Sequence, residues 1–477
     1  MIDLQQLEKL DFSGKPVTIV GLGIEGIDFA RYLARRGALV TVSDTKTPRD
    51  LAQQLQEVAA LPLDLQLGSD PKDALATAEA VFVSQSVPLD SPALIDVRNR
   101  GVPIYSTVQI FLELAPGPVV GITGSSGKTT TTALLGEMFR ADERPTFVGG
   151  NIGVGLLDHL NTIRAYTWSV LEISHTQLQI GDKSPHIAAV LNITPNHLDK
   201  FSWDSYKDLK ANLIRYQTAS DITILNHDDP EVRALEPLVK GRLFWFTMGA
   251  SAPGNGVFVR DGWAVFKGDD GERPLFAFEW LKLRGLHNQE NAAAAAAIAV
   301  AAGVSPDAIA CAVEAFRGVP HRLERVADIN GISYFNDSIA TTPERTIAGL
   351  RSFAEPVVLL LGGRDKQLPL EDLALEALAN CRAIVLFGES GAKLEAAMRS
   401  HPNARSVAIV RTFDLSEAVR LAQMMARVGD VVLLSPACTS YDAYDNFERR
   451  GEHFCRLVEA LNPDRGQPGE EVQASHP

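Results

Sequence analysis

Short apolar runs alternate with longer amphipathic stretches along almost the whole chain. The runs, such as PVTIV, VVGIT and VVLLL, have the length of buried strands, whereas apolar residues in the stretches between them recur with the helical period. Strands that alternate with helices in this way pair in parallel, because each helix carries the chain back across the sheet. The pattern therefore predicts an α/β protein with mainly parallel sheets.

The expected strands fall into three groups, which predict three domains. The first group is PVTIVGLG, ALVTVSD and EAVFVSQSV, and the second is VVGIT, WSVLEIS, IAAVLNIT and DITILN, followed by an alanine-rich helix. The third is ISYFNDS, PVVLLLGG, AIVLFG and VVLLSPA. We expect domains over residues 1–115, 116–317 and 318–463, with a Pro-Gly-Pro linker at 116–118 and a flexible tail over 464–477.

Composition limits the classes of partner. The 477 residues include 45 Lys and Arg against 59 Asp and Glu, a formal net charge of −14, which disfavours nonspecific binding to nucleic acid or to an anionic membrane. Charged residues near the N-terminus argue against a signal peptide, and AAAAAAIAVAAG is too short to span a bilayer. Four scattered cysteines suit a reducing compartment. We expect a cytoplasmic monomer that binds neither nucleic acid nor membranes.

A glycine-rich turn after the first strand indicates a nucleotide site. VTIVGLGIEG places Gly21, Gly23 and Gly26 between a strand and a helix, and Asp44 ends the next strand. This is the dinucleotide-binding fingerprint, in which backbone N–H groups hold a pyrophosphate and the acid meets a ribose. NAD, a sugar nucleotide such as UDP, and a tight turn without a ligand all remain open on these residues alone.

A second phosphate-binding loop follows the strand VVGIT. GSSGKTT leads directly into a helix, so backbone N–H groups can cradle phosphate, Lys128 can reach the terminal phosphates, and the Thr129 hydroxyl can bind Mg²⁺. The chain thus has two phosphate-binding domains in tandem, which a simple dehydrogenase does not need.

The loop TGSSGKTTTT lacks the first glycine of the common phosphate loop, and it resembles the ATP loop of the Mur ligase family, whose enzymes build the stem peptide of peptidoglycan. GGNIGVGLL, LEIS, LNITPNHLDKF, RGLHNQENAAAA, GVPHRLERV and FNDSIATTP resemble further motifs of that family in the same order. GLGIEG and LLSPACTSYDAYDNFERRGEHF are most similar to its glutamate-adding members. The resemblance implies a Rossmann-like first domain, a central P-loop-type ATPase domain and a Rossmann-like C-terminal domain.

The resemblance also implies a reaction and its residues. ATP would activate UDP-N-acetylmuramoyl-L-alanine as an acyl phosphate, which the amine of glutamate attacks. The implied catalytic residues are Lys128, Glu172, His197 and Lys210. The implied ATP site consists of Gly124, Ser125, Ser126, Gly127, Lys128, Thr129, Thr130, Asn151, Asn288, Asn291, Arg322 and Asp337. Two Mg²⁺ ions are implied, with the ligands Thr129, Glu172, His197 and Lys210 as a carbamate.

Two further sets of residues follow from the resemblance. The implied binding site for the UDP substrate consists of Gly23, Ile24, Glu25, Gly26, Asp44, Thr45, Ser84 and Ser86. The implied binding site for glutamate consists of Thr341, Lys366, Ser440, Tyr441 and Phe447. Because these residues come from all three domains, we expect domain closure to assemble the site.

The chain departs from the common pattern of the glutamate-adding members at two places. Ile339 stands where a lysine is usual, and His175 and Thr176 stand where Ser and Phe are usual. D-glutamate is the expected substrate, and a related ligase that adds L-glutamate is the alternative. An NAD-dependent oxidoreductase fused to an ATP domain and a non-catalytic nucleotide-binding scaffold are weaker alternatives. No hydride-transfer residues are evident, and Lys128, Glu172 and His197 are all present.

Overall fold

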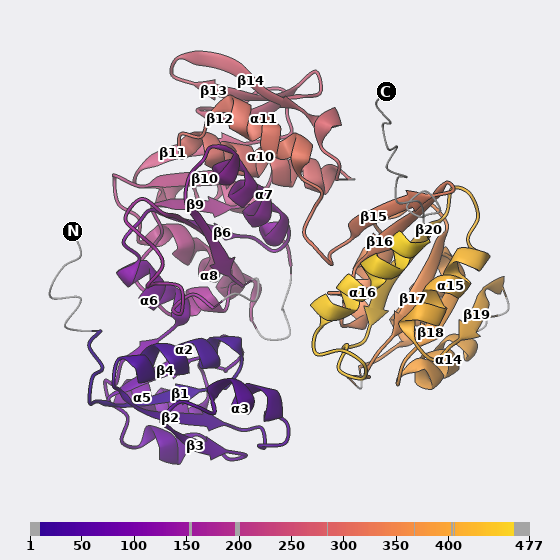
Figure 1. The fold of residues 1–477 in the computed structure, drawn as a ribbon. Coiled ribbons are helices and arrows are strands. Elements are labelled where there is room, and N and C mark those ends of the chain that lie inside the picture. The colour runs from indigo at the N-terminus through magenta and orange to yellow at the C-terminus, as the bar shows by residue number, and fades with distance from the viewer. Residues whose placement is uncertain are drawn as a thin grey trace, which may run out of the picture. The chain divides into compact units, whose positions relative to one another are not determined.

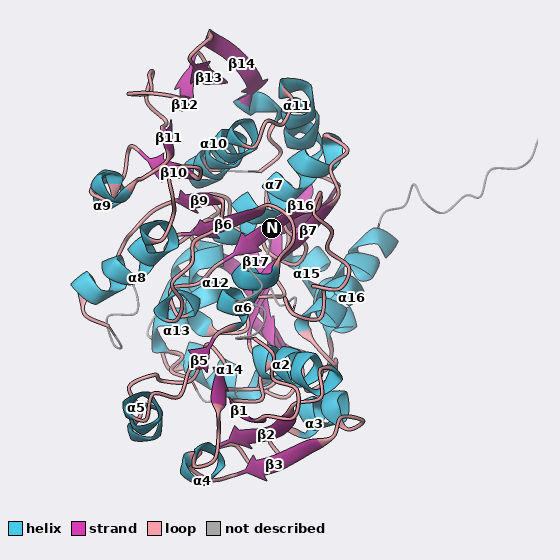
Figure 2. Cartoon of the chain, turned by 90° about the vertical axis from the view of Figure 1, so that its left-hand side faces the viewer, coloured by secondary structure: helices cyan, strands magenta, loops and turns pink. Residues whose placement is uncertain are grey.

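The computed structural model describes residues 10–151, 155–195, 201–283, 285–366, 368–401, 404 and 406–461. The chain forms two compact units, Met1–Phe316 and Arg317–Pro477. The first unit contains two sheets and the second contains one (Figure 1). Helices and strands alternate through all three domains (Figure 2), which confirms the α/β fold with mainly parallel sheets.

The first domain is a parallel sheet in the order β3-β2-β1-β4-β5. Three strands match the expected runs, and the short or polar strands β3 and β5 were missed. The strands are β1 Pro16–Val20, β2 Leu39–Asp44, β3 Leu63–Leu67, β4 Ala80–Val83 and β5 Ile104–Tyr105. The helices are α2 Ile24–Arg35, α3 Ala52–Val58, α4 Lys72–Leu75, α5 Pro92–Asn99 and α6 Thr107–Leu114.

The second sheet has the order β14-β13-β12-β11-β10-β9-β6-β8-β7. It is parallel from β7 to β12, and its last three strands are antiparallel. The strands are β6 Val119–Thr123, β7 Thr146–Gly150, β8 Trp168–Glu172, β9 Ile187–Val190, β10 Ile222–Asn226, β11 Arg242–Phe246, β12 Gly256–Arg260, β13 Trp263–Gly268 and β14 Gly271–Ala277. The antiparallel extension was not predicted, because the βαβ pattern stops before it.

The helices of the second domain pack closely on its sheet. They are α7 Lys128–Ala141, α8 Trp203–Arg215, α9 Pro230–Arg233, α10 Leu286–Ala301 and α11 Pro306–Ala315. The alanine-rich helix α10 lies against α7, and its alanines from 292 to 299 are fully or almost fully buried. Small side chains let the two helices approach closely, and this brings α10 to the phosphate loop at the start of α7.

The third domain has the order β15-β16-β20-β17-β18-β19, and only the edge strand β15 is antiparallel. The strands are β15 Glu324–Ile329, β16 Ile332–Asn336, β17 Val357–Gly362, β18 Cys381–Phe387, β19 Ala408–Arg411 and β20 Val431–Ala437. The helices are α12 Pro343–Leu350, α13 Glu371–Asn380, α14 Gly391–Arg399, α15 Leu415–Met425 and α16 Phe447–Ala460. The first three helices pack into one apolar cluster and the last two into another, so both faces are covered.

The expected linker between the first two domains is a packed segment. Gly117 is buried, and a Cβ there would lie 2.3 Å from the carbonyl oxygen of Thr167. A larger residue would therefore push the segment off the second domain. In the described residues no helix is long and apolar enough to cross a membrane.

Candidate active site

The phosphate loop joins β6 to α7 and is braced by the loop that follows β9. The backbone N–H of Ser126 donates to Oδ1 of Asn192 over 2.8 Å, and the N–H of Thr194 donates to Oγ of Ser125 over 3.0 Å. The ammonium of Lys128 donates to the carbonyl oxygen of Gly124 over 2.9 Å. Because Lys128 is also the first residue of α7, its ammonium and the helix N-terminus lie at the same loop, where phosphate would be bound.

Gly127 and Asn291 meet where α10 passes the phosphate loop. Gly127 has a φ of 81°, and a Cβ there would lie 2.2 Å from Oδ1 of Asn291. The side chain of Asn291 also donates to Oδ1 of Asn288 over 3.3 Å, so both amides lie on one helix face. Contact of this pair with ATP stays a prediction, whereas the contact of Asn291 with the loop is direct.

Glu172 ends β8 beside the end of β7. The Asn151 amide donates to Oε1 of Glu172 over 3.0 Å, and the Asn151 backbone N–H donates to the Glu172 carbonyl oxygen over 2.9 Å. Oε2 of Glu172 is buried and has no hydrogen-bond partner among the described residues. An orphaned carboxylate oxygen at the end of a strand is the kind of ligand that Mg²⁺ prefers.

The other predicted metal ligands are Thr129, His197 and Lys210. His197 lies outside the described residues, and among those described no group of three or more His, Cys, Asp and Glu side chains could hold a metal ion. Thr129 is the second residue of α7, directly after Lys128, as the sequence predicts. Glu172 thus has the chemistry of a Mg²⁺ ligand, and the roles of all four predicted ligands remain predictions.

Lys210 is a buried lysine on the inner face of α8. Its side chain is 1% exposed, and its ammonium lies 4.8 Å from the centre of the Tyr206 ring. Burial, together with the charge of Lys128, lowers the pKa of Lys210 to about 7. The Tyr206 hydroxyl in turn lies 3.1 Å from Oγ of Ser125, so this pair contacts the phosphate loop.

His175, one of the unusual residues, belongs to the same neighbourhood. Its ring centre lies 5.3 Å from that of Tyr206 and 5.4 Å from that of Phe201. The neighbouring Thr176 hydroxyl lies 2.9 Å from the Ser174 hydroxyl and donates to Oε1 of Gln85 over 3.4 Å. His175 and Thr176 therefore occupy different surroundings, His175 beside Tyr206 and Thr176 beside the first domain.

The glycine turn of the first domain has the packing that the fingerprint requires. A Cβ at Gly26 would lie 2.1 Å from the carbonyl oxygen of Gly21, so helix α2 can approach β1 only with glycine there. Asp44 accepts from the backbone N–H of Leu22 over 2.8 Å and of Lys46 over 2.9 Å. Asp44 therefore shapes the turn, and its contact with a ribose stays a prediction.

The other residues of the predicted UDP site differ in exposure. Ile24 is 61% exposed, and Thr45 and Ser86 are also exposed at the same end of the sheet. Ser84 is buried and donates to the carbonyl oxygen of Gly21 over 2.7 Å. The Glu25 carboxylate already accepts hydrogen bonds within the protein.

Arg322 and Asp337 belong to the second unit. Arg322 is exposed, whereas Asp337 is 4% exposed and directly follows β16. Asp337 accepts from the Ser435 hydroxyl over 2.8 Å and from the Leu323 N–H over 3.2 Å. Burial raises the pKa of Asp337 to about 7.

Two of the five predicted glutamate-binding residues meet. The Lys366 ammonium donates to the Thr341 hydroxyl over 3.4 Å. Ser440 is buried, Tyr441 is 53% exposed, and Phe447 begins α16. The Phe447 carbonyl oxygen accepts from the Ser338 hydroxyl over 2.8 Å, which ties the start of α16 to the loop after β16.

Sequence reasoning missed two arginines of this domain. Arg450 is fully buried, and its guanidinium donates to carbonyl oxygens of Ser338, Gly362, Cys438 and Thr439 at 2.9–3.3 Å, so it ties together the loops after β16, β17 and β20. Arg345 donates to the carbonyl oxygen of Ile339 over 3.2 Å. Burial and the charge of Arg345 lower the pKa of Lys366.

These roles were not visible in the sequence. FERRGEHF contains two adjacent arginines, and nothing in the sequence says which one is buried. Arg345 lies six residues after Ile339, at the start of α12. Only the turn between β16 and α12 brings this cation back to Ile339.

Three family models match this chain, one in each of its three domains. Residues 15–106 match the family model described as Mur ligase MurD-like, N-terminal domain. Residues 122–299 match the Mur ligase middle domain, and residues 321–438 match the Mur ligase, glutamate ligase domain.

Curated relatives match the chain over almost its whole length. Proteins named UDP-N-acetylmuramoylalanine–D-glutamate ligase from Symbiobacterium thermophilum and Roseiflexus sp. are each 40% identical, and the matches cover 93% and 95% of this chain and 98% and 100% of those proteins. The protein of that name from Koribacter versatilis is 38% identical over 95% of this chain and 99% of its own length.

Solved structures agree on the fold. UDP-N-acetylmuramate-alanine ligase MurC from Thermotoga maritima matches with a TM-score of 0.55 and 18% identity, over 94% of this chain and 100% of its own. MurF from Acinetobacter baumannii matches with a TM-score of 0.55 and 19% identity, over 95% of this chain and 98% of its own. With three matching family models and such relatives, the chain belongs to the Mur ligase family.

Proposed function

We propose that this protein is an ATP-dependent, ADP-forming ligase that joins D-glutamate to UDP-N-acetylmuramoyl-L-alanine in the synthesis of peptidoglycan precursors. The observation that carries the proposal is the likeness, at 40% identity over 93% of the chain, to a ligase named for that reaction. The phosphate loop with Lys128 and the orphaned oxygen of Glu172 supply the chemistry that such a ligase needs.

ATP is needed because a carboxylate is a poor electrophile. A carboxylate oxygen of the substrate attacks the γ-phosphorus and ADP leaves, which gives an acyl phosphate. The neutral amine of glutamate then attacks the acyl carbon, phosphate leaves, and the nitrogen loses a proton. Positioning and charge neutralisation supply most of the rate of such transfers. Lys128 would neutralise the transferring phosphate, and Asn151 would hold Glu172 in place through the bond to Oε1.

Mg²⁺ bound at Glu172 would neutralise charge on the γ-phosphate. The two Mg²⁺ sites and the carbamate of Lys210 belong to the proposal. An ammonium has no lone pair to bind a metal ion, whereas a carbamate offers two oxygens. Lys210 is 1% exposed, and the charge that acts on its pKa is that of another cation, Lys128. Addition of CO₂ to its neutral amine forms an N–C bond and releases a proton, and the resulting carbamate anion would be a metal ligand where the amine was.

The proposed sites divide between domains. The UDP moiety would bind at the turn from Gly23 to Gly26, with Asp44 and Thr45 beside it. Glutamate would bind in the third domain near Lys366 and Thr341. The cytoplasmic location and monomeric state expected from the sequence remain predictions.

D-glutamate is proposed as the substrate rather than the L-enantiomer. The relatives cited above are all named for D-glutamate. Arg345 beside Ile339 supplies a cation where the usual lysine is absent, so this departure does not require a different substrate. The oxidoreductase alternative has no support from the family models of the three domains.

A phosphate-release assay tests the proposed function. The purified protein is given ATP, Mg²⁺, UDP-N-acetylmuramoyl-L-alanine and either enantiomer of glutamate. We expect kcat/KM for D-glutamate to exceed that for L-glutamate by roughly 10³-fold, because the wrong enantiomer leaves charged groups unpaired. A preference for L-glutamate would assign the protein to the alternative ligase. No release with either enantiomer would overturn the proposed function.

A further inference from the structure

Helix α2 of the first domain contacts two segments of the second domain, one that follows Asn151 in sequence and one that follows Glu172. Asp28 contacts the loop after β7, and Glu25, one turn earlier on the same helix, contacts the loop after β8. The turn from Gly23 to Gly26, where the UDP moiety is proposed to bind, forms the start of this helix. One short helix therefore touches both the proposed sugar-nucleotide site and the loops beside the proposed phosphate-transfer site.

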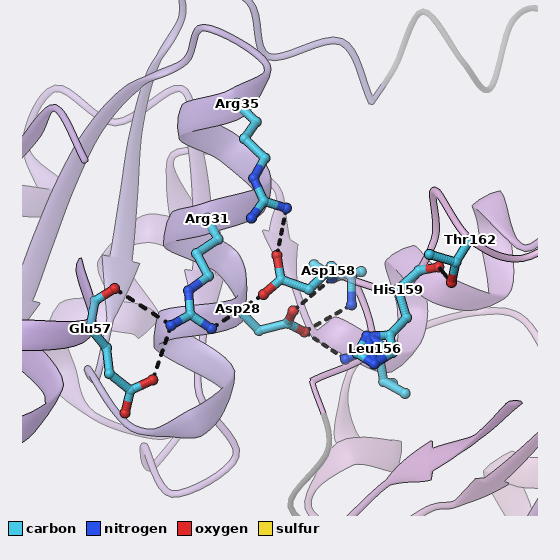
Figure 3. Close-up of polar contacts among 9 residues, drawn as sticks. Asp28, Arg31, Arg35, Glu57, Leu156, Asp158, His159 and Thr162 are labelled. Carbon is cyan, nitrogen blue, oxygen red and sulfur yellow. Dashed lines mark hydrogen bonds and ion pairs between the residues drawn. The ribbon is translucent and has the colours of Figure 1, made fainter. Parts of the chain in front are cut away.

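Asp28 makes an unusual set of contacts for an aspartate in the middle of a helix. It is 3% exposed, and its Oδ2 accepts from the backbone N–H groups of Leu156 and Leu157 over 2.8 and 2.9 Å. Its Oδ1 accepts from the N–H of Asp158 over 2.9 Å. Figure 3 shows the carboxylate pointing from α2 into this loop. Burial raises the pKa of Asp28, and the three N–H donors oppose that rise.

Charged groups around Asp28 set the orientation of the same loop. Asp158 forms ion pairs with Arg31 at 3.3 Å and with Arg35 at 2.9 Å, and both arginines lie on the face of α2 that carries Asp28 (Figure 3). A Cβ at Gly155 would lie 2.9 Å from Oδ1 of Asp28. Residues 156–158 are thus held to α2 closely, through bonds to their backbone.

Glu25 provides the second contact. Its Oε1 accepts from the Gln177 amide over 2.7 Å and from the Thr107 hydroxyl over 2.9 Å. Its Oε2 accepts from the backbone N–H of Gln85 over 2.6 Å. Gln177 lies five residues after Glu172, so this bond anchors the loop that follows the proposed metal ligand.

We propose that Asp28 is a positioning residue of the ligase reaction, which sets the loop after β7 relative to the UDP-binding helix so that the substrate carboxylate meets the γ-phosphate. The inference rests on the proposed function. The argument for this role is geometric. The substrate would be held by its UDP end in one domain and would react at its other end in the next, so the two domains must keep a fixed relative position. Small errors in the position of reacting groups cost large factors in rate.

The test compares Asp28→Asn with wild-type protein, using Asp73→Asn at an exposed position of helix α4 as a control with the same chemical change. Asparagine has the shape of aspartate but offers one acceptor oxygen in place of two. We expect kcat to fall about 10-fold or more, with the dissociation constants of UDP-N-acetylmuramoyl-L-alanine and of a non-hydrolysable ATP analogue each within about 2-fold of wild type by calorimetry. The control should match wild type.

A coupling measurement separates positioning from a structural role. In wild-type protein, we expect the UDP substrate to change the affinity of the ATP analogue, and in Asp28→Asn we expect this coupling factor to approach one. Should Asp28→Asn not fold, Asp28→Glu keeps the charge, displaces the loop by one methylene and should show the same losses.

Three outcomes would overturn the inference: wild-type kcat in both variants, a loss of rate that only follows the folded fraction, or an unchanged coupling factor. Failure of wild-type protein to release phosphate would instead overturn the proposed function, and the coupling measurement distinguishes the two because it needs no turnover.

Discussion

The amide of Asn151 donates a 3.0 Å hydrogen bond to Oε1 of Glu172, while the Oε2 atom of that carboxylate is buried without a partner in the described part of the chain. A buried oxygen of this kind is costly unless a ligand satisfies it. One oxygen is therefore committed to holding the side chain, and the other is available to a cation.

Glu172→Gln tests that assignment. The amide keeps the shape but loses the charge, so we expect phosphate release to fall on the order of 10³-fold and the Mg²⁺ concentration for half-maximal rate to rise. A Mg²⁺ titration of the phosphate-release rate measures both. Glu113→Gln, an exchange at a carboxylate that pairs with Lys183 away from the loop, serves as the control. An unchanged Mg²⁺ dependence would remove Glu172 from the metal site.

Lys128→Ala should abolish ligation and leave the affinity for the UDP substrate nearly intact. The ammonium lies at the phosphate loop of the second domain, whereas the predicted UDP site is in the first. Loss of the charge on a transferring phosphate costs several kcal/mol of barrier, on the order of 10³-fold in rate. Calorimetry with the UDP substrate measures the affinity, and a parallel loss there would contradict the separation of the two sites.

Lys210→Ala should be nearly inactive and partly rescued by acetate, whose carboxylate can replace that of a carbamate. Lys207→Ala, on a more exposed part of α8, should keep its activity and ignore acetate. A carbonyl resonance from ¹³C-bicarbonate that appears in wild-type protein and not in Lys210→Ala would detect the carbamate directly. Wild-type protein with substrates and Mg²⁺ but no such resonance would contradict the modification.

Arg345→Gln should raise the KM for glutamate about 10-fold and leave the KM for ATP unchanged. The guanidinium donates to the carbonyl oxygen of Ile339, and its charge lowers the pKa of Lys366, which belongs to the predicted glutamate site. Arg364→Gln, which removes an exposed ion pair with Glu389, is the control. Equal effects of the two substitutions would mean that Arg345 contributes only to the net charge of the domain. Steady-state kinetics with glutamate varied at saturating ATP provides the numbers.

The raised pKa of Asp337 predicts that the stability of the third domain depends on pH. Its ordinary pKa is 3.8, and in the folded protein burial raises the pKa to about 7. Between these values the unfolded chain is ionised while the folded chain keeps the proton, so the free energy of unfolding falls as pH rises and is constant above the folded pKa.

Asp337→Asn should remove this pH dependence. The difference in stability between variant and wild type should change by up to about 1.4 kcal/mol per pH unit across that window. Hydrogen exchange in β16 and β20 measures the local free energy of opening, and Asp445→Asn, at an exposed position, should keep the wild-type slope. Identical slopes in Asp337→Asn and wild type would show that Asp337 does not keep its proton.

The fold and the phosphate loops could be predicted from the sequence because each depends on contiguous residues. The buried run VVLLL has the length and composition of a central parallel strand, and β17 occupies that place. Gly26 follows Gly21 by the spacing of the dinucleotide-binding turn. In the structure a Cβ at Gly26 would lie 2.1 Å from the carbonyl oxygen of Gly21, as the close approach in that turn requires. Strand β3, LDLQL, was missed because polar residues interrupt the apolar pattern of this sheet edge.

The tertiary structure alone decided which distant residues meet. Asn291 lies against Gly127, and Asp28 accepts from N–H groups about 130 residues away, contacts that depend on how helices cross and loops return. No local pattern distinguishes buried Arg450 from exposed Arg449, because the difference depends on the carbonyl groups of three loops that converge on one side of α16. The sequence therefore determined the elements and the chemistry of the phosphate loops, and packing decided which side chains hold those loops in place.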